Sequence, residues 1–220
     1  MKQAVIFDMD GVLVASGPAH KASWQMLARR HGLNISDQQF SGTFGMASRE
    51  IIRQLWGDVS PDRVSALDDE KEAIYRELIT GMVPLMIGAR EVLAALAQAA
   101  FVLAVATSGP PANMNLVLDE TRLRPFFAAA VNSFDVPRGK PAPDVFLGAA
   151  ERLGVPPRQC LVIEDAPVGV EAALAAGMRV AALAGTHAPA TLAAAGAHRV
   201  VSRLAEIQPA LVNELLTVAR

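Results

Sequence analysis

Cysteine is almost absent from this sequence of 220 residues, and long apolar runs are absent altogether. The single Cys160 excludes an internal disulfide and any metal site built from several thiolates. Although 52% of the residues are hydrophobic, no uninterrupted apolar run approaches the roughly 18 residues that a membrane-crossing helix needs. We therefore expect no membrane partner.

An excess of charge of either sign is also missing. The formal net charge is -2 at pH 7, which provides neither the basic field that binds nucleic acid nor an acidic tail. Asp8 lies where a secretory signal would need its apolar stretch. We expect a cytoplasmic protein that acts on a small molecule and has no nucleic-acid partner.

Short apolar runs rich in β-branched residues recur along the chain, with longer helical stretches between them. The expected strands cover residues 3–8, 101–106, 129–132, 160–163, 178–182 and 198–201. This alternation favours an α/β fold of the doubly wound, Rossmann-like kind, in which helices cover both faces of a parallel sheet. Ligands of such sheets bind at the carboxyl ends of the strands.

Between the first and second expected strands, the sequence contains only helical patterns. Amphipathic periodicity covers residues 20–30, 48–55 and 61–80. The sequence therefore predicts an α/β core domain made of residues 1–14 and 88–220, and an inserted all-helical cap domain made of residues 15–87.

A pair of carboxylates follows the first expected strand. Asp8 and Asp10 are two positions apart and point the same way, and Gly11 allows the backbone to turn beside them. Two like charges at this spacing are costly unless they share a cation or a proton. A capped turn would need only one aspartate, so the pair favours a catalytic or metal site.

Three later segments also place polar residues near strand ends. Thr107 and Ser108 offer hydroxyls and backbone amides for an anion, although such residues also end many strands as simple caps. Lys140 lies in a proline-stiffened loop, where positioning and plain solvent exposure are comparable alternatives. Glu164 and Asp165 would suit a hard cation such as Mg²⁺, or would simply complement a helix dipole.

Together, these four segments resemble the four motifs of the haloacid-dehalogenase-like phosphohydrolases, in order and at suitable spacing. The resemblance covers nearly the whole chain. It is greatest to the branch that contains beta-phosphoglucomutase and the small sugar-phosphate phosphatases, whose members also carry a helical cap between the first and second motifs.

The resemblance implies a catalytic role for each matched residue. Asp8 would attack phosphorus and become an aspartyl phosphate, while Asp10 would protonate the leaving alcohol and later activate water. Thr107 and the Ser108 amide would hold the phosphoryl oxygens. Lys140 would neutralise the charge between Asp8 and the phosphate.

The resemblance also implies a Mg²⁺ site. Its expected ligands are the carboxylates of Asp8 and Asp165 and the backbone carbonyl of Asp10, with Glu164 as an additional or water-mediated ligand. The presence of the second acid, Asp10, favours phosphate esters over the substrates of dehalogenases and phosphonate hydrolases.

Two positions of the expected cap match residues that face the active site in beta-phosphoglucomutase-like proteins. His20 matches a histidine of the first cap helix, and residues 45–49 match a Gly-x-x-x-Arg loop. Arg49 would then clamp an anion of the substrate. The alternatives are a histidine on the helix surface, and a solvated ion pair of Arg49 with Glu50 or Asp58. Lys71 and Tyr75, one helical turn apart, could both face the cleft, but the sequence assigns them no role.

Two departures from the family pattern bear on the reaction. Ala15 replaces an acid that commonly follows the first motif, and residues 109–111 replace the Ser-Lys-Asn with which a phosphoglucomutase binds its second phosphate. We therefore expect a Mg²⁺-dependent phosphatase, monomeric, acting on a small phosphorylated metabolite such as a sugar or polyol phosphate. The alternatives are a phosphosugar isomerase of the beta-phosphoglucomutase type and a non-catalytic module that binds a phosphometabolite.

Overall fold

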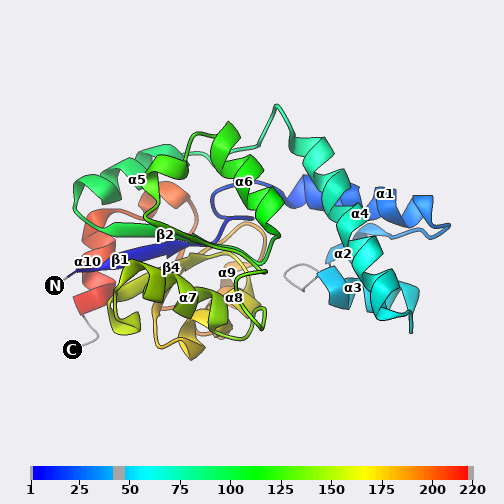
Figure 1. Cartoon of the computed structure of the whole chain (residues 1–220). Coiled ribbons are helices and arrows are strands. Elements are labelled where there is room, and N and C mark those ends of the chain that lie inside the picture. Colours follow the sequence, from blue (N-terminus) through cyan, green and yellow to red (C-terminus); the bar gives the residue numbers. More distant parts are fainter. Residues whose placement is uncertain (1, 42–47, 218–220) are drawn as a thin grey trace.

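Six parallel strands form one central sheet in the order β3-β2-β1-β4-β5-β6 (Figure 1). The computed structural model describes residues 2–41 and 48–217. The strands are β1 (Ala4–Phe7), β2 (Val102–Ala106), β3 (Ala129–Val131), β4 (Cys160–Glu164), β5 (Arg179–Leu183) and β6 (Arg199–Val201). Each lies within one residue of an expected run, because strands buried on both faces read as continuous apolar segments.

Helices cover both faces of the sheet, which confirms the expected α/β class (Figure 1). They are α5 (Ala89–Gln98), α6 (Pro111–Glu120), α7 (Asp144–Leu153), α8 (Pro167–Ala175), α9 (Pro189–Ala194) and α10 (Pro209–Thr217), with 3-10 turns at Arg124–Phe126, Pro157–Gln159 and Leu204–Glu206. Val5 and Phe7 of β1 pack in a cluster with residues of α5, α6 and α10. Ala4 and Ile6 point to the opposite face, in a cluster with α7 and α8.

In its described residues, the segment between β1 and β2 contains helices and no strand of the sheet, as expected. These are α1 (Gly17–Arg30), α2 (Asp37–Ser41), α3 (Ser48–Trp56) and α4 (Pro61–Ile79), and they lie beyond one end of the sheet (Figure 1). Trp24, Leu27, Ile52 and Leu67 belong to an apolar cluster of their own, separate from the two clusters of the sheet. Of the expected loop, Gly45, Met46 and Ala47 lie outside the described residues.

The two chain segments that join these helices to the sheet run side by side. The amide of Ala15 donates to the carbonyl of Pro84 at 2.8 Å, and the amide of Met86 donates to the carbonyl of Leu13 at 2.8 Å. Tyr75, near the end of α4, packs in the same cluster as Phe7 of the sheet. The division into a core domain and a cap domain stays a prediction, and its boundaries fall in these two paired segments.

None of the helices within residues 2–41 and 48–217 combines the length and the apolar character that crossing a bilayer requires. Cys160 is fully buried at the start of β4, where the low-dielectric surroundings raise the pKa of its thiol to about 12. It behaves as a core residue.

Candidate active site

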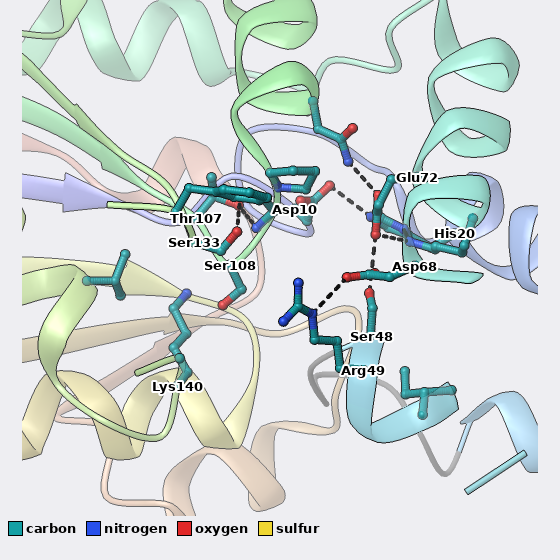
Figure 2. A pocket seen from close by; sticks show the side chains of 18 of the residues that line it. Asp10, His20, Ser48, Arg49, Asp68, Glu72, Thr107, Ser108, Ser133 and Lys140 are labelled. Carbon is teal, nitrogen blue, oxygen red and sulfur yellow. Dashed lines mark hydrogen bonds and ion pairs between the residues drawn. The ribbon is translucent and has the colours of Figure 1, made fainter. Parts of the chain in front are cut away.

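A cavity of about 900 Å³ lies where the carboxyl ends of β1, β2 and β4 face helices α1, α3 and α4. Every residue predicted to be functional lines this cavity, although the four motifs are scattered along the chain. They are Asp8, Asp10, His20, Arg49, Thr107, Ser108, Lys140, Glu164 and Asp165. The doubly wound topology brings the strand ends together, and the inserted helices close the opposite side (Figure 2).

Asp8 is the first residue after β1 and is 6% exposed. Its Oδ1 accepts a 2.6 Å hydrogen bond from Nζ of Lys140, which also donates to Oε1 of Glu164 at 2.7 Å. The two carboxylates raise the pKa of Lys140 despite its burial, so this side chain stays a cation. The side chain of Lys140 is 6% exposed and is paired with two carboxylates, so the solvated-surface alternative is wrong.

The carboxyl group of Asp8 is held in an electrostatically costly position. Burial raises its pKa to about 7, with Glu164 adding to the increase and the cation of Lys140 opposing it. A second cation nearby would stabilise this buried carboxylate more than it would stabilise a solvated carboxylate, because little water remains to screen the charge.

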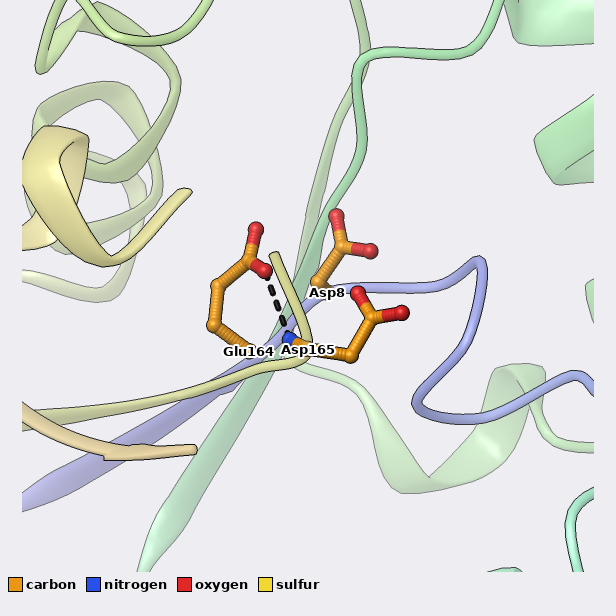
Figure 3. A group of neighbouring side chains, drawn as sticks. All are labelled: Asp8, Glu164 and Asp165. Carbon is orange, nitrogen blue, oxygen red and sulfur yellow. Dashed lines mark hydrogen bonds between the residues drawn. The ribbon is translucent and has the colours of Figure 1, made fainter. Parts of the chain in front are cut away.

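Asp8, Glu164 and Asp165 form the acidic cluster of the site, with ligand atoms all within 4.8 Å of one another (Figure 3). Asp165 is buried, yet its Oδ2 has no hydrogen-bond partner among the described residues, and burial together with Glu164 raises its pKa well above the ordinary value. An orphaned carboxylate oxygen next to a second carboxylate is the donor set that a hard divalent cation satisfies. These residues fit a metal ion such as Mg²⁺.

Gly11 makes this arrangement possible. Its φ is +80°, and a Cβ at this position would lie 1.8 Å from Oδ2 of Asp165. The turn after Asp10 therefore accepts only glycine, and it brings the backbone against the orphaned carboxylate.

Glu164 is the most constrained member of the cluster. Its Oε2 accepts hydrogen bonds from the amides of Asp165 at 2.7 Å and Ala166 at 2.8 Å, while Oε1 accepts from Lys140. A Cβ on Gly169 would lie 1.7 Å from Oε1. The contacts of Glu164 hold Lys140 and the start of α8 in place, and metal ligation by Glu164 stays a prediction.

The loop after β2 supplies hydroxyls and amides, as expected. Thr107 is buried, and its Oγ1 accepts a 3.0 Å hydrogen bond from the amide of Gly109. Ser108 is exposed to the cavity, and Figure 2 shows it on the same side as Lys140. The two residues form a polar edge next to Asp8.

Asp10 faces the opposite side of the cavity, where it meets two aromatic side chains from the helical segment. Nε2 of His20 lies 3.1 Å from Oδ1 of Asp10, and the hydroxyl of Tyr75 donates to the same oxygen at 3.1 Å. Burial alone would raise the pKa of Asp10, but His20 and these hydrogen bonds outweigh it and lower the pKa to about 2. His20 is thus directed onto Asp10 and is not a plain surface residue.

Lys71 and Tyr75, to which the sequence assigned no role, complete this arrangement. The rings of His20 and Tyr75 stack at 4.0 Å with an interplanar angle of 4°. Nζ of the buried Lys71 lies 2.8 Å from Nδ1 of His20 and donates to Oε1 of Glu72 at 2.9 Å. Their spacing of four residues on one helix was the available signal.

Arg49 lines the cavity with a side chain that is 58% exposed. Its Nε donates to Oδ2 of Asp68 at 3.4 Å (Figure 2). Arg49 therefore forms an ion pair, as one alternative expected, but its partner is Asp68 and not Glu50 or Asp58. The sequence could not show this partner, because Asp68 reaches Arg49 through the packing of α3 on α4.

Asn113 on α6 connects the two sides of the cavity. Its Nδ2 donates to Oε2 of Glu72 at 2.6 Å, and its Oδ1 accepts from Arg76 at 2.9 Å. Both partners belong to α4, so one buried amide joins the helical segment to the sheet domain. No local sequence pattern marks this contact.

Comparison with known proteins gives a consistent result. Residues 2–177 match the model of the haloacid dehalogenase-like hydrolases. The chain is 33% identical to fructose-1-phosphate phosphatase YqaB of Escherichia coli K12, over 79% of this chain and 92% of that protein. It is 35% identical to hexitol phosphatase A of the same organism, over 81% of each chain.

A solved structure agrees over nearly the whole length. A haloacid dehalogenase hydrolase of family IA, variant 3, from Entamoeba histolytica HM-1:IMSS superposes with a TM-score of 0.91 at 28% identity, covering 99% of this chain and 100% of that one. The family resemblance read from the four motifs is confirmed. The chain belongs to the haloacid dehalogenase-like hydrolase family and is an enzyme of the hydrolase class.

Proposed function

We propose that this enzyme is a Mg²⁺-dependent phosphatase that hydrolyses a sugar or polyol monophosphate through an aspartyl phosphate at Asp8. The observation that carries the proposal is the position of Asp8: its carboxylate faces the cavity between the cation of Lys140 and the orphaned oxygen of Asp165. Phosphoryl transfer needs little beyond an aligned nucleophile and neutralisation of charge.

In the first half-reaction, a carboxylate oxygen of Asp8 attacks phosphorus while the ester P–O bond breaks. Lys140 offsets the negative charge shared by Asp8 and the phosphoryl group, and Thr107 and the amide of Ser108 hold its oxygens. Asp8, Asp165 and the Asp10 carbonyl would hold a divalent cation, which would supply further neutralisation of the phosphoryl charge.

In this proposal, Asp10 acts as the general acid of the first half-reaction and as the general base of the second. It gives a proton to the departing alkoxide, and then takes one from the water that attacks the aspartyl phosphate. The contacts with His20 and Tyr75 hold Asp10 ionised at neutral pH, which is the state of the base. To act as the acid, Asp10 must first take up a proton after substrate has entered.

Hydrolysis is favoured over the isomerase alternative by the loop after β2. Residues 109–111 bring glycine and prolines, not a cation, to the wall of the cavity, and a mutase must grip both phosphates of a bisphosphate intermediate. The matched Escherichia coli proteins are phosphatases by name. Cytoplasmic location and a monomeric state stay predictions.

The test is phosphate release from hexitol, hexose and nucleotide monophosphates, with Mg²⁺ and with EDTA, next to an assay for conversion of beta-glucose 1-phosphate to glucose 6-phosphate. We expect release from polyol or sugar phosphates that stops in EDTA. Conversion of the glucose phosphate without release would contradict hydrolysis, and release that continues unchanged in EDTA would contradict metal dependence.

A further inference from the structure

The wall of the cavity that faces the phosphate site is acidic, although the proposed substrate is an anion. Three carboxylates of α4 line it, from Asp68, Asp69 and Glu72. Asp68 and Glu72 are four positions apart and so lie on the same face of α4, while Asp69 lines the cavity from the adjoining position.

The cations on this wall are already engaged. Arg49 pairs with Asp68 at 3.4 Å, and Lys71 pairs with Glu72 at 2.9 Å while it is 2% exposed. The guanidinium of Arg76 is oriented by the side-chain oxygen of Asn113. Among the described residues, this wall therefore carries three cations and three carboxylates, two of each in ion pairs, and it has no excess positive charge with which to bind a second anionic group.

The remaining border of this part of the cavity is formed by side-chain hydroxyls and by an aromatic ring. Ser108 and Ser133 border the cavity from the sheet side, where Ser133 donates to the carbonyl of Gly109. Phe134, 71% exposed, lies at the rim. Carboxylates, hydroxyls and an aromatic ring are suited to a neutral polyhydroxylated chain, whose hydroxyls donate and whose C–H groups contact the ring.

We propose that Asp68 is a specificity-determining residue that selects monophosphates whose leaving group is uncharged and rich in hydroxyls. This inference rests on the proposed function and adds the chemistry of the far end of the substrate. Asp68 accepts hydrogen bonds from hydroxyls and neutralises Arg49, so that the arginine does not attract a second phosphate or a carboxylate. Specificity of this kind arises from repulsion of the wrong ligand as well as from attraction of the right one.

The electrostatics of Asp68 support this selection. Burial raises the pKa of its carboxyl, and the neighbouring Glu72 raises it further. Burial and the negative charge of Glu72 already disfavour the ionised form of Asp68. An anionic leaving group in the same cavity would disfavour that form further, so the two would repel each other.

A matched pair of substrates tests the proposal. Glucitol 6-phosphate and 6-phosphogluconate have the same chain length and differ at the end far from the phosphate, which is a hydroxymethyl group in one and a carboxylate in the other. We expect the wild type to favour glucitol 6-phosphate in kcat/KM by at least about tenfold. The Asp68→Asn variant, in which Arg49 loses its counter-charge, should reduce that ratio about tenfold or more.

The control is Glu77→Gln, which removes an exposed carboxylate of the same helix that does not line the cavity. This variant should keep the wild-type ratio. A wild type that favours 6-phosphogluconate, or an Asp68→Asn variant with a ratio within twofold of the wild type, would overturn the assignment of Asp68.

A binding titration separates this inference from the proposed function. Calorimetric affinities for the two compounds, measured in an Asp8→Asn background with and without Asp68→Asn, report selection without turnover. If the enzyme binds glucitol 6-phosphate in preference, as predicted, but the wild type hydrolyses no ester, the result would contradict the proposed phosphatase activity and support the role of Asp68. Hydrolysis of p-nitrophenyl phosphate without the preference, or binding of neither compound, would contradict the role of Asp68.

Discussion

Nζ of Lys71 lies 2.8 Å from Nδ1 of His20, whose Nε2 in turn lies 3.1 Å from Oδ1 of Asp10. An ammonium group can only donate hydrogen bonds, so the contact assigns the proton of a neutral His20 to Nε2, from which it points at Asp10. A lysine of α4 thereby sets the tautomer of the histidine that contacts the acid/base residue.

Replacing Lys71 by methionine should therefore lower kcat for an alkyl phosphate by roughly 10- to 100-fold, because His20 loses the contact that fixes its tautomer. Steady-state kinetics, with circular dichroism to verify folding, provide the measurement. The matched control is Lys21→Met on the partly exposed part of α1, for which we expect nearly wild-type kcat. Equal kcat in the Lys71→Met variant and the wild type would remove Lys71 from the catalytic arrangement.

Tyr75 allows a smaller change at the same place. Tyr75→Phe keeps the ring that stacks on His20 and removes only the hydroxyl that donates to Asp10. A hydrogen bond to an ionised carboxylate contributes roughly 1.5 to 3 kcal/mol, so kcat should fall roughly 10- to 100-fold and the melting temperature should fall by a few degrees. A loss above about 100-fold, or none at all, would contradict this account of the hydroxyl.

The turn at Gly11 provides a test of the metal site. Gly11→Ala places a methyl group against Oδ2 of Asp165, so activity should fall by on the order of 100-fold or more and saturation with Mg²⁺ should require much higher concentrations. Gly57→Ala is the matched control, because Gly57 has a similar φ of +73°, but beyond its chain neighbours no atom of the described residues lies within 4 Å of the added methyl group. Both variants carry backbone strain of about 1 kcal/mol, and only the first should lose activity. Equal activity in the two would contradict the expected fit between Gly11 and the metal site.

Much of this site could be predicted from the sequence because its motifs follow strands. Asp8, Thr107 and Glu164 each come at or just after the end of a continuous apolar run, and parallel topology alone brings such ends together. The helix α2, with five residues, is too short to show a period and was not predicted.

The contacts across the cavity could not be predicted in the same way. Asp68 meets Arg49 and Asn113 meets Glu72 only because separate helices pack in a particular orientation, and nothing in their local sequence records the partner. Lys71 was marked in the sequence only by its spacing of one helical turn from Tyr75, which does not reveal its contact with His20. The roles of these residues depend on tertiary packing, which buries polar side chains against partners from other helices.

The raised pKa of Asp8 has a consequence for stability. Its ionised form opposes folding, and this penalty is absent below its ordinary pKa of 3.8, grows as the pH rises, and is complete above about 7. In EDTA at pH 7.5, Asp8→Asn should therefore melt higher than the wild type by on the order of 5 °C. The difference should shrink at pH 5 and when Mg²⁺ is added.

Thermal melts at the two pH values, with Asp58→Asn as an exposed control, measure this difference. A variant less stable than the wild type at pH 7.5 in EDTA would show that the contact with Lys140 outweighs the cost of burying the carboxylate.

The central claim is that Asp8 carries the phosphoryl group. The most direct measurement is rapid acid quench of the enzyme during turnover of a monophosphate ester with Mg²⁺, followed by borohydride reduction and peptide mass spectrometry. Borohydride converts an aspartyl phosphate to homoserine, and we expect homoserine at position 8 in the wild type and none in Asp8→Asn. Homoserine at another aspartate, or an Asp8→Asn variant that still turns over the ester, would contradict the account.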